Sequence, residues 1–349
     1  MVQYTLWGTE VDLDLPKEIF PTDDEMKKLE DNARNSKHDF FRSGRGDESY
    51  LLHYRTWLPK EGVEPKGICI YQHGIQANSG MACKLKDGTV TKTAVLTKNL
   101  VEAGYEVYGL DMLGHGFSEG RRFYIPDGDW TINRDDLASF AMHISGQKKE
   151  LPLFLFGESY GSCLAIHVAR QWMDDTDNAP ANFKGICVIA PAIIGDLPPT
   201  VVVKLLTYLA SKYPTKTPFF MPATVSPERI WRVDEVREYF TAPREHEMRL
   251  HGGGNKFCLG TALGLLNALE ESRTKAIPGL TVPFAVAHGT NDYGVPIAGT
   301  HFLLDHSVTP EEDREVRILE GAFHDLLSEE SSDETMEFFI KWMSSRIAK

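Results

Sequence analysis

Residues 153–170 read LFLFGESYGSCLAIHVAR, and this stretch decides the predicted fold. Its first four residues are continuously apolar, as in a strand that is covered on both faces. Gly157-Glu158-Ser159-Tyr160-Gly161 follows, and residues 162–173 then have the pattern of a helix. In such a strand–turn–helix unit the central serine lies on a strained turn that exposes its hydroxyl, and glycines flank it because strand and helix approach closely. A Gly-x-Ser-x-Gly motif alone is weak evidence, so the rest of the chain has to supply the context.

The alternation of strand and helix recurs along the chain. Further strands are predicted at residues 50–57, 67–72, 107–111, 185–190, 283–288 and 315–319. Further helices are predicted at residues 90–103, 133–145 and 333–345. Short apolar strands that alternate with helices are typical of parallel sheets with right-handed crossovers. The sequence therefore predicts an α/β fold with a mostly parallel central sheet and helices on both faces.

One long segment, residues 192–276, breaks this alternation because it is rich in proline and has the pattern of short helices without strands. Open α/β sheets bind ligands beyond the carboxyl ends of their strands, so we interpret this segment as a helical cap over that edge. Its apolar residues 201–210 and 218–222 suit a fatty or aromatic acyl pocket or a lipid surface, and simple packing on the core is the alternative.

The predicted domain organisation has three parts. Residues 1–48 are interpreted as an N-terminal helical extension, with a polar surface helix at residues 23–35 and a turn after it. Residues 49–191 and 277–349 together form the α/β core, and residues 192–276 form the cap.

Composition and charge narrow the possible partners. The chain has 37 basic and 50 acidic residues, which gives a net charge of -13 and argues against binding to nucleic acid. The first residues lack a signal-peptide pattern, and no run of about 18 apolar residues predicts a transmembrane helix. The five cysteines are irregularly spaced, which favours a reducing compartment. We therefore expect a cytoplasmic protein, with the cap as a candidate surface for peripheral membrane contact.

The proposed chemistry requires partners for Ser159. A serine hydroxyl becomes a good nucleophile when a histidine takes its proton and an acid orients that histidine. In this fold class the chain order is serine, acid, histidine. Asp292 follows the strand at 283–288 in the segment HGTNDYGVP, and His324 follows the strand at 315–319 in the segment GAFHD. These two residues are the predicted acid and base.

Other interpretations of these residues remain open. Asp292 is alternatively a turn residue that satisfies its own backbone, and His324 is alternatively a helix-capping or core histidine. His73, His115 and His288 compete as bases, but each precedes a glycine in a predicted loop and is interpreted as shaping that loop.

An acyl-transfer site also needs hydrogen-bond donors where negative charge develops. The backbone N–H of Tyr160, directly after the serine, is one candidate. The backbone N–H of Ile75, in the loop after the strand at 67–72, is the other. The chain has no His-x-x-x-His or Cys-x-x-Cys pair, and we predict neither a metal site nor a cofactor.

Several segments together resemble a known family. They are His73-Gly74, DMLGHGFSEG at 111–120, YIPD at 124–127, GESYG at 157–161, HGTND at 288–292, Val295-Pro296 and GAFHDLL at 321–327. They span roughly residues 50 to 345 and resemble the monoacylglycerol lipase and lysophospholipase-like, S33-type branch of the α/β-hydrolase superfamily. Glu158 and the Tyr-x-Pro-Asp segment are more similar to plant and algal members than to animal members.

The resemblance implies hydrolysis of monoacylglycerol or lysophospholipid esters through an acyl-enzyme. It further implies a triad of Ser159, Asp292 and His324 and a mobile helical cap that lines an acyl tunnel. The chain departs from the family at Ser162, where a further glycine is common, and in residues 75–79, which lack the commoner acidic-histidine pair. Alternatives are an esterase for phenolic esters, a thioesterase, an acyltransferase, a serine aminopeptidase, or a non-catalytic ligand-binding protein of the same fold.

Overall fold

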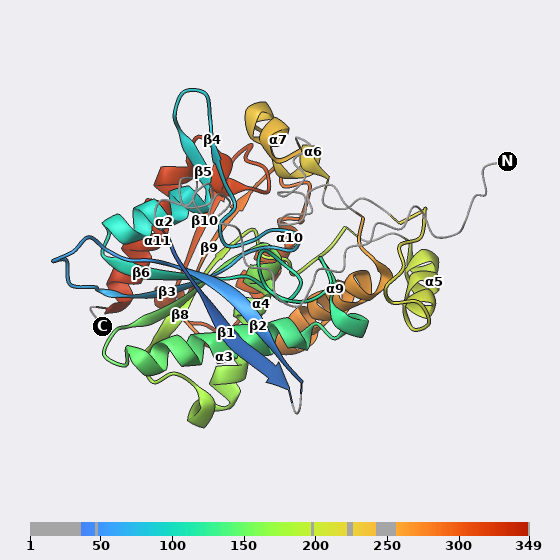
Figure 1. Cartoon of the computed structure of the whole chain (residues 1–349), viewed down its shortest axis with the longest axis horizontal. Helices are drawn as coiled ribbons and strands as arrows, with labels where there is room; N and C mark the ends of the chain where they lie inside the picture. The colour runs from blue at the N-terminus through green and yellow to red at the C-terminus, as the bar shows by residue number, and fades with distance from the viewer. Residues whose placement is uncertain (1–35, 46–47, 197–198, 222–225, 242–255, 348–349) are drawn as a thin grey trace.

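The computed structural model describes residues 36–45, 48–196, 199–221, 226–241 and 256–347, and a twisted sheet runs through its centre (Figure 1). The sheet has eight strands in the order β1-β2-β6-β3-β7-β8-β9-β10. The strands are β1 (Lys37–Arg45), β2 (Glu48–Trp57), β3 (Gly67–Gln72), β6 (Tyr105–Leu110), β7 (Leu153–Glu158), β8 (Phe183–Ile189), β9 (Phe284–Gly289) and β10 (Arg314–Leu319). The pairs β1–β2 and β2–β6 are antiparallel and all others are parallel, which confirms the predicted mostly parallel sheet.

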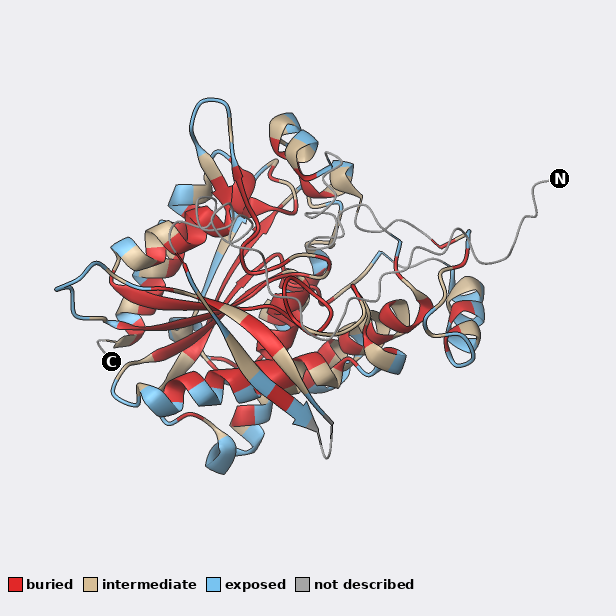
Figure 2. Ribbon diagram, viewed as in Figure 1, coloured by how far each residue is buried: buried red, intermediate tan, exposed pale blue. Residues whose placement is uncertain are grey.

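Helices cover both faces of the sheet, as predicted. On one face lie α2 (Thr93–Glu102) and α11 (Ser332–Ile347), and on the other lie α3 (Thr131–Gln147), α4 (Tyr160–Asp174) and α10 (Ala298–His306). Strand side chains alternate between the two layers: Ile68 and Ile70 of β3 pack with α3 and α4, whereas Cys69 and Tyr71 pack with α2 and α11. Figure 2 shows the result: the inner strands of the sheet are buried, whereas the edge strands β1 and β10 are more exposed.

The regular secondary structure described between β8 and β9 consists of helices joined by loops. It contains α5 (Thr200–Ala210), α6 (Pro227–Ile230), α7 (Asp234–Thr241), α9 (Leu259–Glu271) and a π-helical turn (Ser272–Ala276). Short 3-10 turns elsewhere are η1 (Pro126–Gly128), η2 (Thr176–Asn178), η4 (Glu311–Asp313) and η5 (Leu326–Ser328). Among the described residues, no helix combines the length and apolar character that crossing a lipid bilayer requires.

Two parts of the chain differ from the sequence-based prediction. Residues 37–45, inside the predicted helical extension, form β1, in which Phe41 pairs with Leu52 of β2 and packs on Phe140 of α3. The predicted helix at 23–35 lies outside the described residues. Residues 90–92, predicted as the start of a helix, form β5 (Val90–Lys92), which pairs with β4 (Ala82–Lys84) in a small antiparallel sheet. These strands are stabilised by pairing with the neighbouring strand of a hairpin, and β1 also by packing on α3, which a helical pattern in the sequence does not reveal.

The parallel strands bring distant residues to one edge of the sheet. His73 follows β3, Asp111 follows β6, and Ser159 follows β7. Asp292 and His324 lie in the loops after β9 and β10. Because parallel strands all end at the same edge, these residues gather there, and that edge is where the candidate site forms.

The packing predicts how a core truncation affects stability. Phe156 of β7 is fully buried and contacts the ring of Phe339 of α11 edge to face, with 4.9 Å between centroids. We expect Phe156→Ala to lower the free energy of unfolding by about 3–5 kcal/mol, because it leaves a cavity between sheet and helix. Denaturant unfolding followed by circular dichroism measures this. Phe219→Ala is the matched control, since Phe219 is 62% exposed, and should cost less than about 1 kcal/mol; equal losses would contradict the packing argument.

Candidate active site

Ser159 occupies a sharp turn between β7 and α4. Its backbone has φ 56° and ψ -117°, a left-handed conformation that non-glycine residues rarely adopt. A Cβ atom on Gly161 would lie 2.1 Å from the carbonyl oxygen of Gln72, and one on Gly157 would lie 2.5 Å from the carbonyl oxygen of Gly161. Both glycines are therefore required by the close approach of strand and helix, which was the reason inferred from the sequence.

Asp292 has two roles, one for each carboxylate oxygen. Its Oδ1 accepts hydrogen bonds from the backbone N–H groups of Gly294 (2.8 Å) and Val295 (2.7 Å). Its Oδ2 lies 2.7 Å from Nδ1 of His324 and 3.0 Å from Nε2 of His288. Asp292 is thus both the turn residue and the partner of His324 that the sequence offered as alternatives. Burial by itself raises the pKa of this carboxyl, but the two histidines outweigh it and hold the pKa below its usual value.

His324 is buried beside Ser159, and both residues line the same cavity. Burial lowers the pKa of His324, but the charge and hydrogen bond of Asp292 raise it more, with a further contribution from Glu158 and an opposing one from Lys92. The net result is a pKa above the usual histidine value of 6.5. With Nδ1 turned to Asp292, the other ring nitrogen, Nε2, is available to face the cavity.

The three competing histidines have other roles. His288 lies in β9 instead of a loop, and its Nε2–H donates to Asp292 while Nδ1 lies 2.7 Å from the hydroxyl of Thr300. His73 accepts a hydrogen bond from the backbone N–H of Met112 (3.1 Å), and His115 accepts one from that of Gln76 (3.2 Å). Sequence reasoning missed the support that His288 gives to Asp292, although its spacing of four residues from that acid is visible in the sequence.

The candidate oxyanion donors lie on two sides of Ser159. Ile75 and Tyr160 both line the cavity that contains Ser159. A Cβ atom on Gly74 would be 3.1 Å from Cβ of Ser159, so this loop lies directly against the turn. Tyr160 is the first residue of α4, and the N–H groups in the first turn of a helix have no carbonyl partner within it and favour negative charge.

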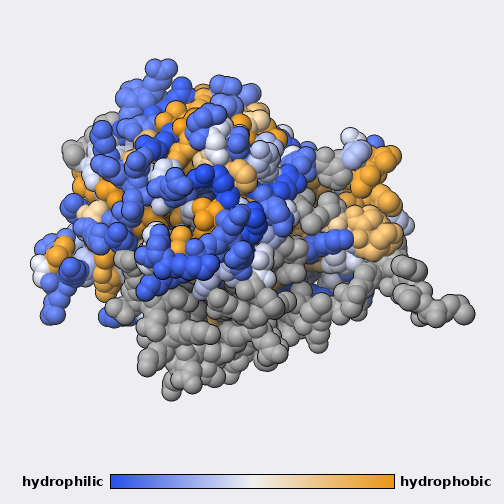
Figure 3. Space-filling model, turned by 90° about the horizontal axis from the view of Figure 1, so that it is seen from above, coloured by the Kyte–Doolittle hydropathy of each residue, from blue (hydrophilic) through white to orange (hydrophobic). Residues whose placement is uncertain are grey.

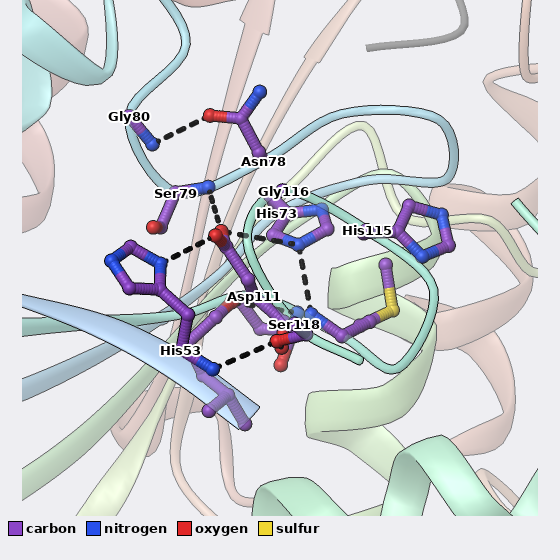
Figure 4. A network of polar contacts seen from close by, with 12 residues as sticks. His53, His73, Asn78, Ser79, Gly80, Asp111, His115, Gly116 and Ser118 are labelled. Atoms are coloured by element: carbon purple, nitrogen blue, oxygen red, sulfur yellow. Dashed lines mark hydrogen bonds and ion pairs between the residues drawn. The ribbon is translucent and has the colours of Figure 1, made fainter. Parts of the chain in front are cut away.

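A buried network around Asp111 holds the loop that carries Ile75. Figure 4 shows the Asp111 carboxylate facing the backbone of Ser79 and the ring of His53. The Ser79 N–H donates to Oδ1 (2.6 Å), and Nδ1 of His53 lies 2.7 Å from Oδ2. A Cβ atom on Gly116 would lie 1.9 Å from Oδ2, so only glycine fits there. Sequence reasoning assigned no role to Asp111, although a carboxylate at the end of a buried strand was a visible signal.

The main cavity at Ser159 has a volume of about 150 Å³ and is lined chiefly by apolar side chains. Core residues and the segment between β8 and β9 both contribute to it. The apolar side chains from that segment include Leu206, Met221, Ile230, Phe257, Leu265 and Leu269.

A second, smaller cavity of about 50 Å³ also reaches Ser159 and His324. It contains charged and polar side chains, among them Lys92, Glu158 and Trp231. Buried charged groups therefore lie beside Ser159 and His324, next to the apolar main cavity.

Known proteins resemble the chain over most of its length. Residues 64–331 match the family described as Serine aminopeptidase, S33. The monoglyceride lipase of Rattus norvegicus is 28% identical over 310 residues, which are 86% of this chain and 89% of that protein. The caffeoylshikimate esterase of Arabidopsis thaliana is 27% identical over 357 residues, which are 98% of this chain and 92% of that protein. A crystal structure of monoacylglycerol lipase from Paleococcus ferrophilus has the same fold, with a TM-score of 0.66 at 21% identity, over 84% of this chain and 99% of that one.

The family match covers more than half of the chain, and the mostly parallel sheet with helices on both faces is that of the α/β-hydrolases. The protein therefore belongs to the Serine aminopeptidase, S33 family, has the α/β-hydrolase fold and is a serine ester hydrolase.

Proposed function

We propose that this lipid ester hydrolase cleaves carboxylic esters of the monoacylglycerol or lysophospholipid type through an acyl-enzyme, with Ser159, Asp292 and His324 as its catalytic triad. The observation that carries the proposal is the placement of Ser159 and His324 on one apolar cavity, with Nδ1 of His324 held 2.7 Å from Asp292. The relatives named as monoglyceride lipases support the substrate class.

The proposed reaction has two halves. Nε2 of His324 takes the proton of Ser159 as Oγ attacks the ester carbonyl, and the N–H groups of Ile75 and Tyr160 donate to the resulting oxyanion. The intermediate collapses when His324 passes its proton to the departing alcohol oxygen, which leaves an acyl group on Ser159. A water molecule, activated by His324, then hydrolyses this acyl-enzyme and regenerates the serine. Asp292 orients His324 and stabilises its charged form throughout.

The described helices between β8 and β9 support the proposal that residues 192–276 form a cap. Several of them line the acyl cavity, while α5 turns other apolar side chains outward. Val201 and Tyr208 are 76% and 63% exposed, and Figure 3 shows apolar side chains gathered at the right edge of the molecule, where α5 lies in Figure 1. Exposed apolar patches of this kind often mark lipid or protein contacts. We propose that α5 contacts the lipid surface from which an ester enters.

A second candidate, hydrolysis of phenolic acyl esters, is favoured by one observation. The caffeoylshikimate esterase matches 98% of this chain, more than the 86% matched by the rat monoglyceride lipase. An apolar cavity accepts an aromatic acyl group as well as an aliphatic one. The free state of all five cysteines supports the proposal of a cytoplasmic location for either activity.

The nucleophile is tested by substitution. We expect Ser159→Ala to abolish labelling by a fluorophosphonate probe and to lower the rate of ester hydrolysis about 10³-fold or more, since no other group forms the acyl-enzyme. Gel fluorescence and a spectrophotometric ester assay measure the two effects. Ser211→Ala, at an exposed serine, is the control and should change neither. Labelling that persists in Ser159→Ala would contradict the assignment and favour a non-catalytic binding protein.

The pH dependence follows from the raised pKa of His324. The histidine must be neutral to accept the serine proton, so kcat/KM should fall as the pH drops through a value above 6.5. Asp292→Asn removes the charge that favours the correct tautomer and should reduce kcat/KM about 10³- to 10⁴-fold. Asp305→Asn, at an exposed aspartate of α10, is the matched control. A profile that stays flat down to pH 5 would rule out His324 as the base.

The acyl group is tested with a series of esters of one alcohol. We expect medium and long acyl chains to give kcat/KM about tenfold or more above the acetyl ester, because each buried methylene adds favourable transfer energy. A clear preference for acetyl would contradict the lipid substrate class. A preference for feruloyl or caffeoyl esters would instead support the phenolic alternative.

A further inference from the structure

Three charged side chains are buried together next to Ser159 and His324. Nζ of Lys92 lies 2.8 Å from Oε1 of Glu158 and 3.2 Å from Oδ2 of Asp325. The three residues are 6%, 4% and 1% exposed. Glu158 directly precedes Ser159, and Asp325 directly follows His324. One ammonium group therefore links the two turns that carry the proposed nucleophile and base.

Neighbouring groups complete this ion cluster of Lys92, Glu158 and Asp325. The Tyr71 hydroxyl donates to Oε2 of Glu158 (2.8 Å). Nε1 of Trp231 donates to Oδ2 of Asp325 (2.7 Å).

The cluster also reaches the segment proposed as the cap. Trp231 belongs to that segment, and the backbone N–H of Asp325 donates to the carbonyl oxygen of Ile230, 3.1 Å away. The turn that carries His324 is thus held to the cap by a side-chain bond and a backbone bond, both through Asp325.

The backbone of Lys92 has a conformation that is uncommon for a residue other than glycine. Lys92 has φ 61°, in the left-handed region, at the junction of β5 and α2. Such a conformation persists in a non-glycine residue only where the surroundings hold it, and it is frequent at functional sites. Here it places the ammonium group against two carboxylates that burial would otherwise leave unpaired.

The charges of the cluster act on His324 from outside the triad. Burial lowers the pKa of Lys92, but the two carboxylates outweigh it and raise the pKa, so Lys92 stays charged. Burial raises the pKa of Glu158, but Lys92 and the Tyr71 hydroxyl outweigh it and lower the pKa, so Glu158 is ionised. Burial and the charge of Glu158 raise the pKa of Asp325, although Lys92 opposes this.

Charged groups from several parts of the chain lie close to His324. Asp292, supported by His288, lies on one side, and Glu158 and Lys92 lie on the other, where they line the small cavity together with His324. Asp325 is its neighbour in the chain. Glu158 favours the charged form of His324 and Lys92 disfavours it.

We propose that Lys92 is a positioning residue that joins the turns of Ser159 and His324 and balances the negative charge of Glu158 that faces His324. This inference rests on the proposed function, because it assigns His324 the role of base. It goes beyond the triad, since it makes Lys92 and Glu158 an opposed pair of charges that sets the pH range in which the base works.

The chain offers a matched control pair at the opposite edge of the sheet. Glu106, near the start of β6, is 4% exposed, accepts from the Tyr108 hydroxyl (2.7 Å) and lies 3.0 Å from Nζ of Lys148. This pair repeats the Tyr–Glu–Lys chemistry of the cluster at a distance from the site. Glu106→Gln is matched in burial to Glu158→Gln, whereas Lys148 is 36% exposed, so Lys148→Met controls for the loss of a paired lysine away from the site.

The experiment measures the acidic limb of the kcat/KM profile of the full chain, with a short-chain p-nitrophenyl ester as probe. Glu158→Gln should move the limb to lower pH and Lys92→Met to higher pH, each by about half a unit or more, because opposite charges are removed near one base. The control variants Glu106→Gln and Lys148→Met should leave the limb in place. A purely structural role would not move the limb in opposite directions.

Removing a partner from a buried ion cluster can prevent folding, so thermal unfolding is recorded for each variant. If Lys92→Met does not fold, the double variant Lys92→Met/Glu158→Gln is compared with Glu158→Gln. The acidic limb of the double variant should then lie at a higher pH than that of Glu158→Gln. Limbs that stay fixed, or move in the same direction, in folded variants overturn the inference. If the unsubstituted enzyme is not labelled by the fluorophosphonate probe at Ser159, the proposed function is instead overturned.

Discussion

The close approach of β7 and α4 is the constraint on which the site depends. Gly161 lies against the carbonyl oxygen of Gln72 at the end of β3, where a Cβ atom would come within 2.1 Å. The chain reverses between β7 and α4 beside this contact, and Ser159 has φ 56°, in the left-handed region, at the turn. The same contact brings the loop after β3, with Gly74 and Ile75, against the serine. One packing event thus exposes the proposed nucleophile and places both candidate oxyanion donors around it.

Buried carboxylates then organise the rest of this edge of the sheet. Asp111 holds the loop after β3, Asp292 holds the ring of His324, and Glu158 with Asp325 holds Lys92. Each carboxylate accepts hydrogen bonds or lies beside a cation, which offsets the cost of removing it from water. The described helices between β8 and β9 supply many of the apolar side chains of the main cavity. Lys92 and Glu158 line the small cavity next to it, together with Ser159 and His324.

Much of the fold was predictable because its inner strands are buried on both faces. Strands such as β3 and β7 are continuous apolar runs with clear ends, and their carboxyl ends place Ser159, Asp292 and His324 in a known chain order. The prediction failed where pairing outweighs local pattern. Residues 37–45 read as part of a polar extension, but they form β1 because Phe41 packs on α3 and the backbone pairs with β2. Residues 90–92 read as helix, but they pair with β4.

The sequence by itself determined the α/β class, the serine at the turn and the order of acid and base, because these depend on local hydrophobic runs and on the steric needs of glycine. Tertiary structure alone decided which groups surround them. Lys92 and Glu158 are 66 residues apart, and Lys92 contacts the glutamate only because folding brings the end of β5 to the end of β7. Trp231 and Asp325 are 94 residues apart, and their hydrogen bond likewise exists only in the folded chain. The motif from Gly157 to Gly161, which first indicated the fold, is thus local in sequence. The ion pairs of Lys92 with Glu158 and Asp325 form only in the folded chain, because they join residues from three separate segments.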